Sequence, residues 1–207
     1  MFIMLLLVLT MAFEIELKAR LDDPLPVKER ISALGTYRRS YTKADSYWVP
    51  ARAAPGPSTV RIRHESGEYA DGSAYDSVLV TYKAKKISGS VEINDEREFT
   101  VSDMALFEDL LRYLGLCQDI CKEKKGWDWT FPPEQYGEPI TAELSLLTGL
   151  GWFLELEMVT NTNDPQTIAK NQKRLFALLA RLEVPVEYIE PRPYTAMLRQ
   201  QPGGKHP

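Results

Sequence analysis

Residues suited to several common kinds of site are scarce in this chain. Its 207 residues include two cysteines, Cys117 and Cys121, and two histidines, His64 and His206. The cysteines have neither the spacing of a zinc site nor the number needed for a disulfide framework, so we expect reduced packing residues in a cytoplasmic protein. One histidine beside a loop and one near the end of the chain disfavour a catalytic histidine.

The chain also has no excess of positive charge. The net charge is −4 and the sequence pI is about 5.4. A protein without a global basic field is a poor partner for nucleic acid or an anionic membrane surface. Any anion-binding site must therefore be local.

Residues 1–12 form an apolar, uncharged run. It is shorter than the roughly 20 residues that span a bilayer, and it lacks the basic start and cleavage site of a secretory signal. Translation from Met11 would leave most of it out; an uncleaved anchor and an apolar arm packed on a partner are the alternatives. We expect no stable membrane association, one domain over residues 13–199 and a loose tail over residues 200–207.

The informative stretch is the first strand after this run. Glu14, Glu16 and Lys18 alternate with apolar residues, which is the period of a β-strand with one charged face. A solvated face would explain one such strand. The pattern recurs along the chain, however, and a solvated face does not explain why each repeat carries charge of mainly one sign.

Further elements follow from periodicity and from turn residues. Helices are predicted over residues 24–34, 103–114 and 165–182, and the apolar stripe of the second contains Leu106, Phe107, Leu110, Leu111 and Leu114. Strands are predicted over residues 38–49, 60–63, 78–85, 96–99, 120–124, 140–147 and 153–158. The second and third of these strands should form a hairpin with a long polar tip that contains Gly67 and Gly72.

Paired charges lie on one face of most of these strands. The acidic pairs are Glu14 with Glu16, Glu96 with Glu98, and Glu155 with Glu157; the basic pairs are Arg61 with Arg63, Lys83 with Lys85, and Lys122 with Lys124. The residues between them are apolar and suited to packing beneath amphipathic helices. We therefore predict an α+β fold in which an antiparallel sheet curls into a barrel or tunnel, with helices outside and charges inside.

A charged interior is costly unless the charges pair with each other or with a ligand. Seven cations, with Lys18 included, predict a polyanionic ligand. Carboxylate oxygens suit Mg²⁺ or Mn²⁺, which share phosphate oxygens with the protein. A nucleoside or other organic triphosphate satisfies these conditions without a Walker-type glycine loop, and the chain has none.

The order of these residues resembles the CYTH superfamily of triphosphate tunnel metalloenzymes. The resemblance extends over nearly all of residues 13–198 and depends on an ordered set of motifs. This set comprises Glu14-x-Glu16-x-Lys18, Asp45-x-Tyr47, Arg61-x-Arg63, Lys83, Glu96-x-Glu98, Lys122-x-Lys124, Leu150-Gly151 with Phe153-x-Glu155-x-Glu157, and Tyr194-x-x-Met197-Leu198.

Within the superfamily the chain looks most like class IV adenylate cyclases. This resemblance implies an eight-stranded antiparallel tunnel, a divalent metal, a possible homodimer, and conversion of ATP into cyclic AMP and pyrophosphate. Related members hydrolyse inorganic or thiamine triphosphate. Three departures are Ser145 in place of an Asp, with Glu143 two residues earlier, Lys43 in place of a Gln, and Pro193 in place of a Ser. The missing acid leaves the choice between cyclase and hydrolase open.

The charge of each residue on the inner face, together with the resemblance, predicts its role. Lys18, Glu16 and Glu157 are the expected catalytic residues. The expected triphosphate ligands are Lys18, Arg61, Arg63, Lys83, Lys85, Lys122 and Lys124, and the expected metal ligands are Glu14, Glu16, Glu155 and Glu157. Weaker candidates are Glu96, Glu98, Glu143, Ser145 and Arg192. Glu96 and Glu98 would either hold basic neighbours or bind metal, and Arg192 would either reach the phosphates or lie on the surface. The alternative for Lys85 is a position that only lines the tunnel mouth. Trp127 and Trp129 would pack or stack on a base. A non-catalytic polyphosphate or nucleotide binder is a third functional class.

Overall fold

The computed structural model describes residues 13–51, 60–88, 91–133, 138–162 and 164–201, without the side chains of residues 13, 83–88 and 91–96. The predicted extension over residues 1–12, most of the predicted tail, and the side chains of Lys83, Lys85 and Glu96 therefore lie outside the described residues. In the described part of the chain, no helix has the length and apolar character needed to cross a membrane.

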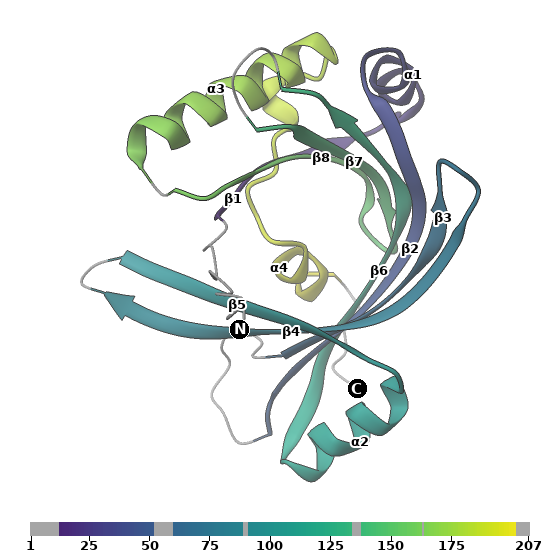
Figure 1. Ribbon diagram of the computed structural model, residues 1–207, viewed down its shortest axis with the longest axis vertical. Helices are drawn as coiled ribbons and strands as arrows, with labels where there is room; N and C mark the ends of the chain where they lie inside the picture. Colours follow the sequence, from purple (N-terminus) through teal and green to yellow (C-terminus); the bar gives the residue numbers. More distant parts are fainter. Residues whose placement is uncertain (1–12, 52–59, 89–90, 134–137, 163, 202–207) are drawn as a thin grey trace, which may run out of the picture.

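The architecture is α+β, as predicted, and its centre is an eight-stranded antiparallel sheet. The strands are β1 (Phe13–Leu21), β2 (Thr36–Pro50), β3 (Val60–Tyr69), β4 (Ala74–Ser88), β5 (Val91–Val101), β6 (Leu116–Phe131), β7 (Ile140–Leu147) and β8 (Gly151–Thr160). Their order in the sheet is β1-β8-β7-β6-β2-β3-β4-β5. The sheet is strongly curved, with β1 and β5 as its two edge strands (Figure 1).

The convex face is covered by helices (Figure 1). Helices α1 (Leu25–Leu34) and α3 (Pro165–Arg181) pack over β1, β6 and β8, and α2 (Met104–Tyr113) packs beside the other end of β6. The largest core cluster includes Leu17, Leu144, Leu156 and Leu179, all at most 7% exposed. Apolar residues of alternate strand positions therefore face outward beneath helices, as the period-2 pattern predicts.

Two helix predictions need correction. The apolar stripe predicted on α2 is wider than the face that packs against the sheet. Leu111 is buried, but Leu106, Leu110 and Leu114 are exposed. The C-terminal helix α4 (Tyr194–Arg199), which follows the 3₁₀ turn η1 (Val186–Tyr188), was not predicted at all. It lies on the concave side of the sheet (Figure 1), where it contacts β6.

The hairpin between β3 and β4 also differs from its prediction. Its register runs from Val60 opposite Tyr82 to Glu68 opposite Ala74, so the tip is short and Gly67 lies within the strand. A Cβ atom at Gly67 would overlap the carbonyl oxygen of Ser40, and one at Gly126 would overlap that of Leu144. Both glycines flank Tyr41 in the sheet. They permit the close backbone approach that a strongly curved sheet requires here.

The two cysteines are free, as expected, but neither is a packing residue. Cys117 and Cys121 are both exposed on β6. Trp129 is buried in the core, and Trp127 stacks against Trp152 with ring centroids 6.0 Å apart. Both tryptophans pack with the core cluster beneath α1 and α3, which matches the packing alternative rather than base stacking.

Candidate functional site: the concave face

The concave face collects charged residues from most strands. Lys18, Lys122 and Lys124 are each at most 9% exposed although they carry charge. They lie on the opposite side of their strands from the residues packed under the helices. The curvature of the sheet thus turns the predicted charged faces toward one another.

A carboxylate that was not predicted as a site residue holds two of the cations. Asp45 on β2 lies opposite Arg63 on β3 and Lys122 on β6. Its carboxylate accepts hydrogen bonds from Arg63 Nε at 2.7 Å and Nη2 at 2.9 Å, and Lys122 Nζ lies 2.9 Å away. Burial opposes its ionisation, but the hydrogen bonds from Arg63 and the charge of Lys122 keep the pKa of Asp45 well below its usual range.

A second network joins β2, β6, β7 and β8. Lys124 Nζ donates to Glu143 and, at 2.8 Å, to Glu155, while Lys43 Nζ donates to Glu143 at 2.6 Å. Burial works against ionised Glu143, but Lys124 and Lys43 keep its pKa well below the usual value. Burial and the neighbouring charge of Glu143 raise the pKa of Glu155, despite Lys124. These two lysines are therefore compensated by protein carboxylates.

Arg39 anchors a third group of charges on the same face. Its Nε donates to Asp128 at 2.6 Å and its Nη1 to Glu65 at 2.5 Å. Tyr75 also donates to Glu65, at 3.2 Å. Asp45, Glu65 and Asp128 thus supply buried carboxylates that were not among the predicted site residues.

Arg61 and Glu98 lie toward the β5 edge of the sheet. Arg61 Nη2 donates to Thr81 Oγ1 at 2.9 Å, and the Thr81 hydroxyl donates to Glu98 at 3.0 Å. Arg61 is 3.7 Å from the Glu98 carboxylate. Glu98 is thus placed to hold a basic neighbour, one of its two expected roles. The backbone of Lys83 pairs with that of Glu96 on the adjacent strand.

A carboxylate cluster lies at the other edge of the sheet. Glu16 on β1 is directly opposite Glu157 on β8, and Glu14 is two residues from Glu16 on the same face. Burial, followed by the charges of Glu14 and Glu16, raises the pKa of Glu157 to about 7. Burial and the neighbouring carboxylates act in the same direction on Glu157, which favours binding of a cation beside it.

The fit of these residues to a divalent metal rests on their donor atoms. Among the described residues, no three His, Cys, Asp or Glu side chains converge as a ready-made metal site. Mg²⁺ and Mn²⁺ often take only one or two protein carboxylates and complete their coordination with water and phosphate oxygens. The carboxylate oxygens of Glu16 and Glu157 suit such an ion, and its charge would relieve the repulsion between these carboxylates.

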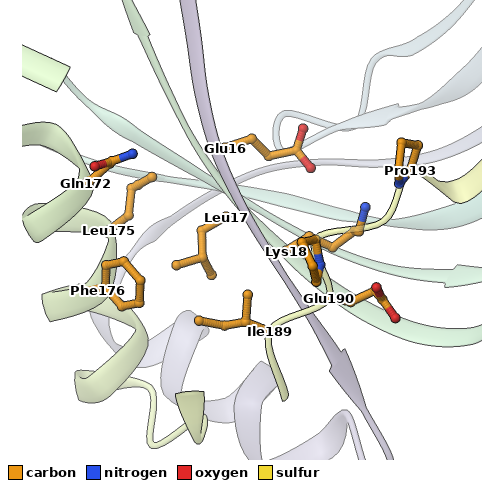
Figure 2. A pocket seen from close by; sticks show the side chains of 10 residues that line it. Glu16, Leu17, Lys18, Gln172, Leu175, Phe176, Ile189, Glu190 and Pro193 are labelled. Carbon is orange, nitrogen blue, oxygen red and sulfur yellow. The ribbon is translucent and has the colours of Figure 1, made fainter. Parts of the chain in front are cut away.

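Lys18 lies where the concave face meets a cavity of about 540 Å³ at the β1 edge. Glu16 and Lys18 point to one side of β1, and Leu17 points to the other side, toward Leu175 and Ile189 (Figure 2). Lys18 Nζ donates to the carbonyl oxygen of Arg192 at 2.7 Å. The Arg192 guanidinium itself is exposed and binds Glu190, with Nε 2.8 Å from Oε1. Arg192 therefore occupies the surface position that was one of its two alternatives.

Ser145 lies on β7 in the position where the cyclase-like pattern carries an Asp. It is fully buried, and its hydroxyl has no hydrogen-bond partner among the described residues. Glu143, two residues away on the same face, supplies a carboxylate instead, but Lys43 and Lys124 already neutralise it.

Most residues that the prediction missed follow the same alternation as those it found. Arg39, Tyr41, Lys43 and Asp45 occupy alternate positions of β2, so the period-2 pattern was a sufficient signal for their face. The exception is Tyr194 on α4, whose ring lies within 6 Å of three lysine ammonium groups of the concave face. Its six-residue helix gives no comparable periodic signal, although Tyr194 belongs to the Tyr194-x-x-Met197-Leu198 motif of the resemblance.

The curved antiparallel sheet, the outer helices (Figure 1) and the ordered charges on the concave face are features that the predicted resemblance to the CYTH superfamily implies. No family model matches the chain. A curated protein of Methanocaldococcus jannaschii named "Putative adenylate cyclase MJ0240" is 26% identical over 176 residues, which are 80% of this chain and 89% of that protein.

Solved structures share the fold. The PH1819 protein of Pyrococcus horikoshii OT3 aligns with a TM-score of 0.67 and 22% identity, over 90% of this chain and 98% of that one. HpAC1 of Hippeastrum, described as a "putative adenylyl cyclase" with a dominant triphosphatase activity, aligns with a TM-score of 0.57 and 17% identity, over 94% of this chain and all of that one. At these identities the structures support the fold alone.

Proposed function

We propose that this protein is a divalent-metal-dependent enzyme that acts on a nucleoside or other triphosphate, of the class IV adenylate cyclase type, converting ATP into cyclic AMP and pyrophosphate. The observation that carries the proposal is the meeting of buried cations from three strands, β1, β2 and β6, with the carboxylate cluster of Glu16 and Glu157 on one concave face. The name of the M. jannaschii relative supports the same activity. In this proposal the curved sheet acts as a tunnel around the substrate.

Binding would proceed by exchange of ion pairs. Lys122 and Arg63 now share Asp45, and Lys124 bridges Glu143 and Glu155. Phosphate oxygens would take hydrogen bonds from these cations and from Lys18, while the carboxylates keep the cations gathered before substrate arrives. This pre-organisation lowers the cost of holding a polyanion in one geometry.

Glu16 and Glu157, with Glu14 and Glu155, would hold one or two Mg²⁺ or Mn²⁺ ions. When bound, such an ion neutralises charge on the phosphate oxygens and orients them for displacement. The chain's own contribution is to place the carboxylates opposite the cations, so that the substrate lies between opposite charges.

In the cyclase reaction, the ribose 3′-oxygen bonds to the α-phosphorus, the bond from that phosphorus to the bridging oxygen breaks, and pyrophosphate leaves. The 3′-hydroxyl proton needs an acceptor whose pKa lies near the working pH. Glu157, whose pKa without metal is about 7, meets this requirement when it does not itself hold the metal. Lys18 and the other cations would stabilise the charge on the leaving pyrophosphate.

Hydrolysis of inorganic or thiamine triphosphate is the second candidate, in which water attacks the terminal phosphorus. The observation that favours it is Ser145, whose buried hydroxyl stands where the cyclase pattern places a carboxylate. The triphosphatase activity attributed to the Hippeastrum protein agrees with this candidate.

Product analysis separates these activities. The purified protein would be incubated with ATP, tripolyphosphate and thiamine triphosphate under Mg²⁺ or Mn²⁺, and the products resolved by chromatography. Cyclic AMP indicates a cyclase, and orthophosphate with a diphosphate indicates a hydrolase. Binding in calorimetry without turnover under either metal would instead indicate a non-catalytic binder.

A further inference from the structure

Tyr194 on α4 is surrounded by the lysines of the concave face. The ammonium groups of Lys18, Lys122 and Lys124 lie 4.3, 5.5 and 5.8 Å from the centroid of its ring. The residue is 8% exposed, and its ring packs edge-on against Phe153 with centroids 5.1 Å apart. One aromatic ring from the C-terminal helix thus contacts cations from two strands that are not adjacent, β1 and β6.

Lys18 depends on the C-terminal segment more than the other two lysines do. Lys122 pairs with Asp45, and Lys124 pairs with Glu143 and Glu155. Lys18 is held by the carbonyl oxygen of Arg192 and by the ring of Tyr194.

An aromatic ring is suited to gathering like charges. The negative face of its quadrupole attracts each ammonium group without adding a formal charge that would compete with phosphate. A carboxylate in this place would attract the same lysines but would repel a triphosphate.

We propose that Tyr194 is a positioning residue for triphosphate binding, whose ring holds the ammonium groups of Lys18, Lys122 and Lys124 together at the phosphate site. This inference rests on the proposed function, because it assigns these lysines to a triphosphate. Tyr194 acts through them and does not itself contact the reacting atoms.

The test compares Tyr194→Phe, which keeps the ring, with Tyr194→Leu, which removes it. Phe153→Leu is the matched control, because Phe153 belongs to the same apolar cluster around α4, while the cation over its ring is Arg20 and not one of the three lysines. Tripolyphosphate binding would be measured by calorimetry, and KM and kcat would be measured with the substrate that the wild-type protein turns over. Thermal unfolding would be recorded for every variant.

Loss of the ring should weaken tripolyphosphate binding and raise KM about 10-fold, as expected for desolvated cation–π contacts. Tyr194→Phe should restore both values to within about twofold of the wild type, since its ring has a similar quadrupole. Phe153→Leu should lower the melting temperature as much as Tyr194→Leu does, with wild-type KM.

Equal binding by wild type and Tyr194→Leu would overturn the inference and leave the proposed function intact. So would a KM increase in Phe153→Leu that matches the increase in Tyr194→Leu, because the effect would then come from packing. A wild-type protein that binds no tripolyphosphate would overturn the proposed function and this inference together.

Discussion

Replacing Glu157 with Gln tests the electrostatics of the carboxylate cluster. The pKa of Glu157 is raised to about 7, from an ordinary value of 4.5, by burial and by the charges of Glu14 and Glu16. As pH rises from about 4.5 to 7, the unfolded chain releases this proton before the folded protein does, so the free energy of unfolding falls. Below pH 4.5 the residue is protonated in both states and has no such effect.

The size of this effect follows from the shift. One pKa unit corresponds to about 1.4 kcal/mol, and partial solvent exposure reduces the full value, so ionised Glu157 should destabilise the fold by about 2 kcal/mol at pH 8. Glu157→Gln has nearly the same shape without the charge. It should therefore be about 2 kcal/mol more stable than the wild type at pH 8 and equally stable at pH 4.

Urea unfolding followed by circular dichroism at both pH values measures this difference. Glu29→Gln, which alters an exposed carboxylate on α1, is the control and should change little at either pH. If Glu157→Gln gains no stability at pH 8, then Glu157 is not held among uncompensated negative charges and the electrostatic reasoning is wrong.

The same pair of proteins tests the metal proposal. At pH 8, millimolar Mg²⁺ or Mn²⁺ should raise the melting temperature of the wild type, because binding to the folded state stabilises it by mass action. Glu157→Gln should show a smaller rise. An equal rise in both proteins would place the bound metal elsewhere.

The remaining predictions concern other parts of the concave face and the sheet. Lys18→Ala and Glu157→Ala should fold normally, as judged by circular dichroism. Each should lose about 100-fold in turnover, as expected when one pre-organised electrostatic contact worth about 3 kcal/mol is removed. Wild-type turnover in both variants would refute the assignment. Asp45→Ala leaves Arg63 and Lys122 buried without their shared partner. The free energy of unfolding at pH 7 should therefore fall by about 3 to 5 kcal/mol. An unchanged urea midpoint would show that solvent or other carboxylates compensate the charges of Arg63 and Lys122. Because the pKa of Asp45 is lowered in the folded state, its contribution should be lost as pH falls below 4 in the wild type, visible as convergence of the two urea midpoints. Gly126→Ala would force a Cβ atom against the Leu144 carbonyl and should lower the melting temperature by several degrees, whereas Gly72→Ala, at a turn where a Cβ meets no atom within 4 Å, should lower it only through its positive φ.

The alternation of charged and apolar residues determined much of this protein before any tertiary contact was known. Strand parity alone puts Glu16 and Lys18 on one face of their strand and Leu17 on the other, because side chains alternate along any strand. The ordered motifs then identify the fold class. Alternation along β2 also places Lys43 and Asp45 on one face of that strand. Charge alone did not identify Asp45 as the partner of Arg63 and Lys122.

Where sequence reasoning failed, the cause was competition between similar local signals. The leucines of α2 form one wide stripe, and only packing against β2, β3 and β4 selects Leu111 over Leu106 and Leu110 as the buried residue. Gly67 indicates a turn by composition, but it lies in a strand where the curved backbone needs a residue without Cβ. The helix α4 is too short for a periodic pattern to reveal it.

Sequence by itself thus determined which residues face inward, because that property depends on a local period of two. Only the tertiary structure decided which charges meet, because Asp45 reaches Lys122, and Tyr194 reaches Lys18, through strand register and curvature that join distant segments. The pKa of Glu157 has the same origin, since it depends on the charges that β1 brings opposite β8.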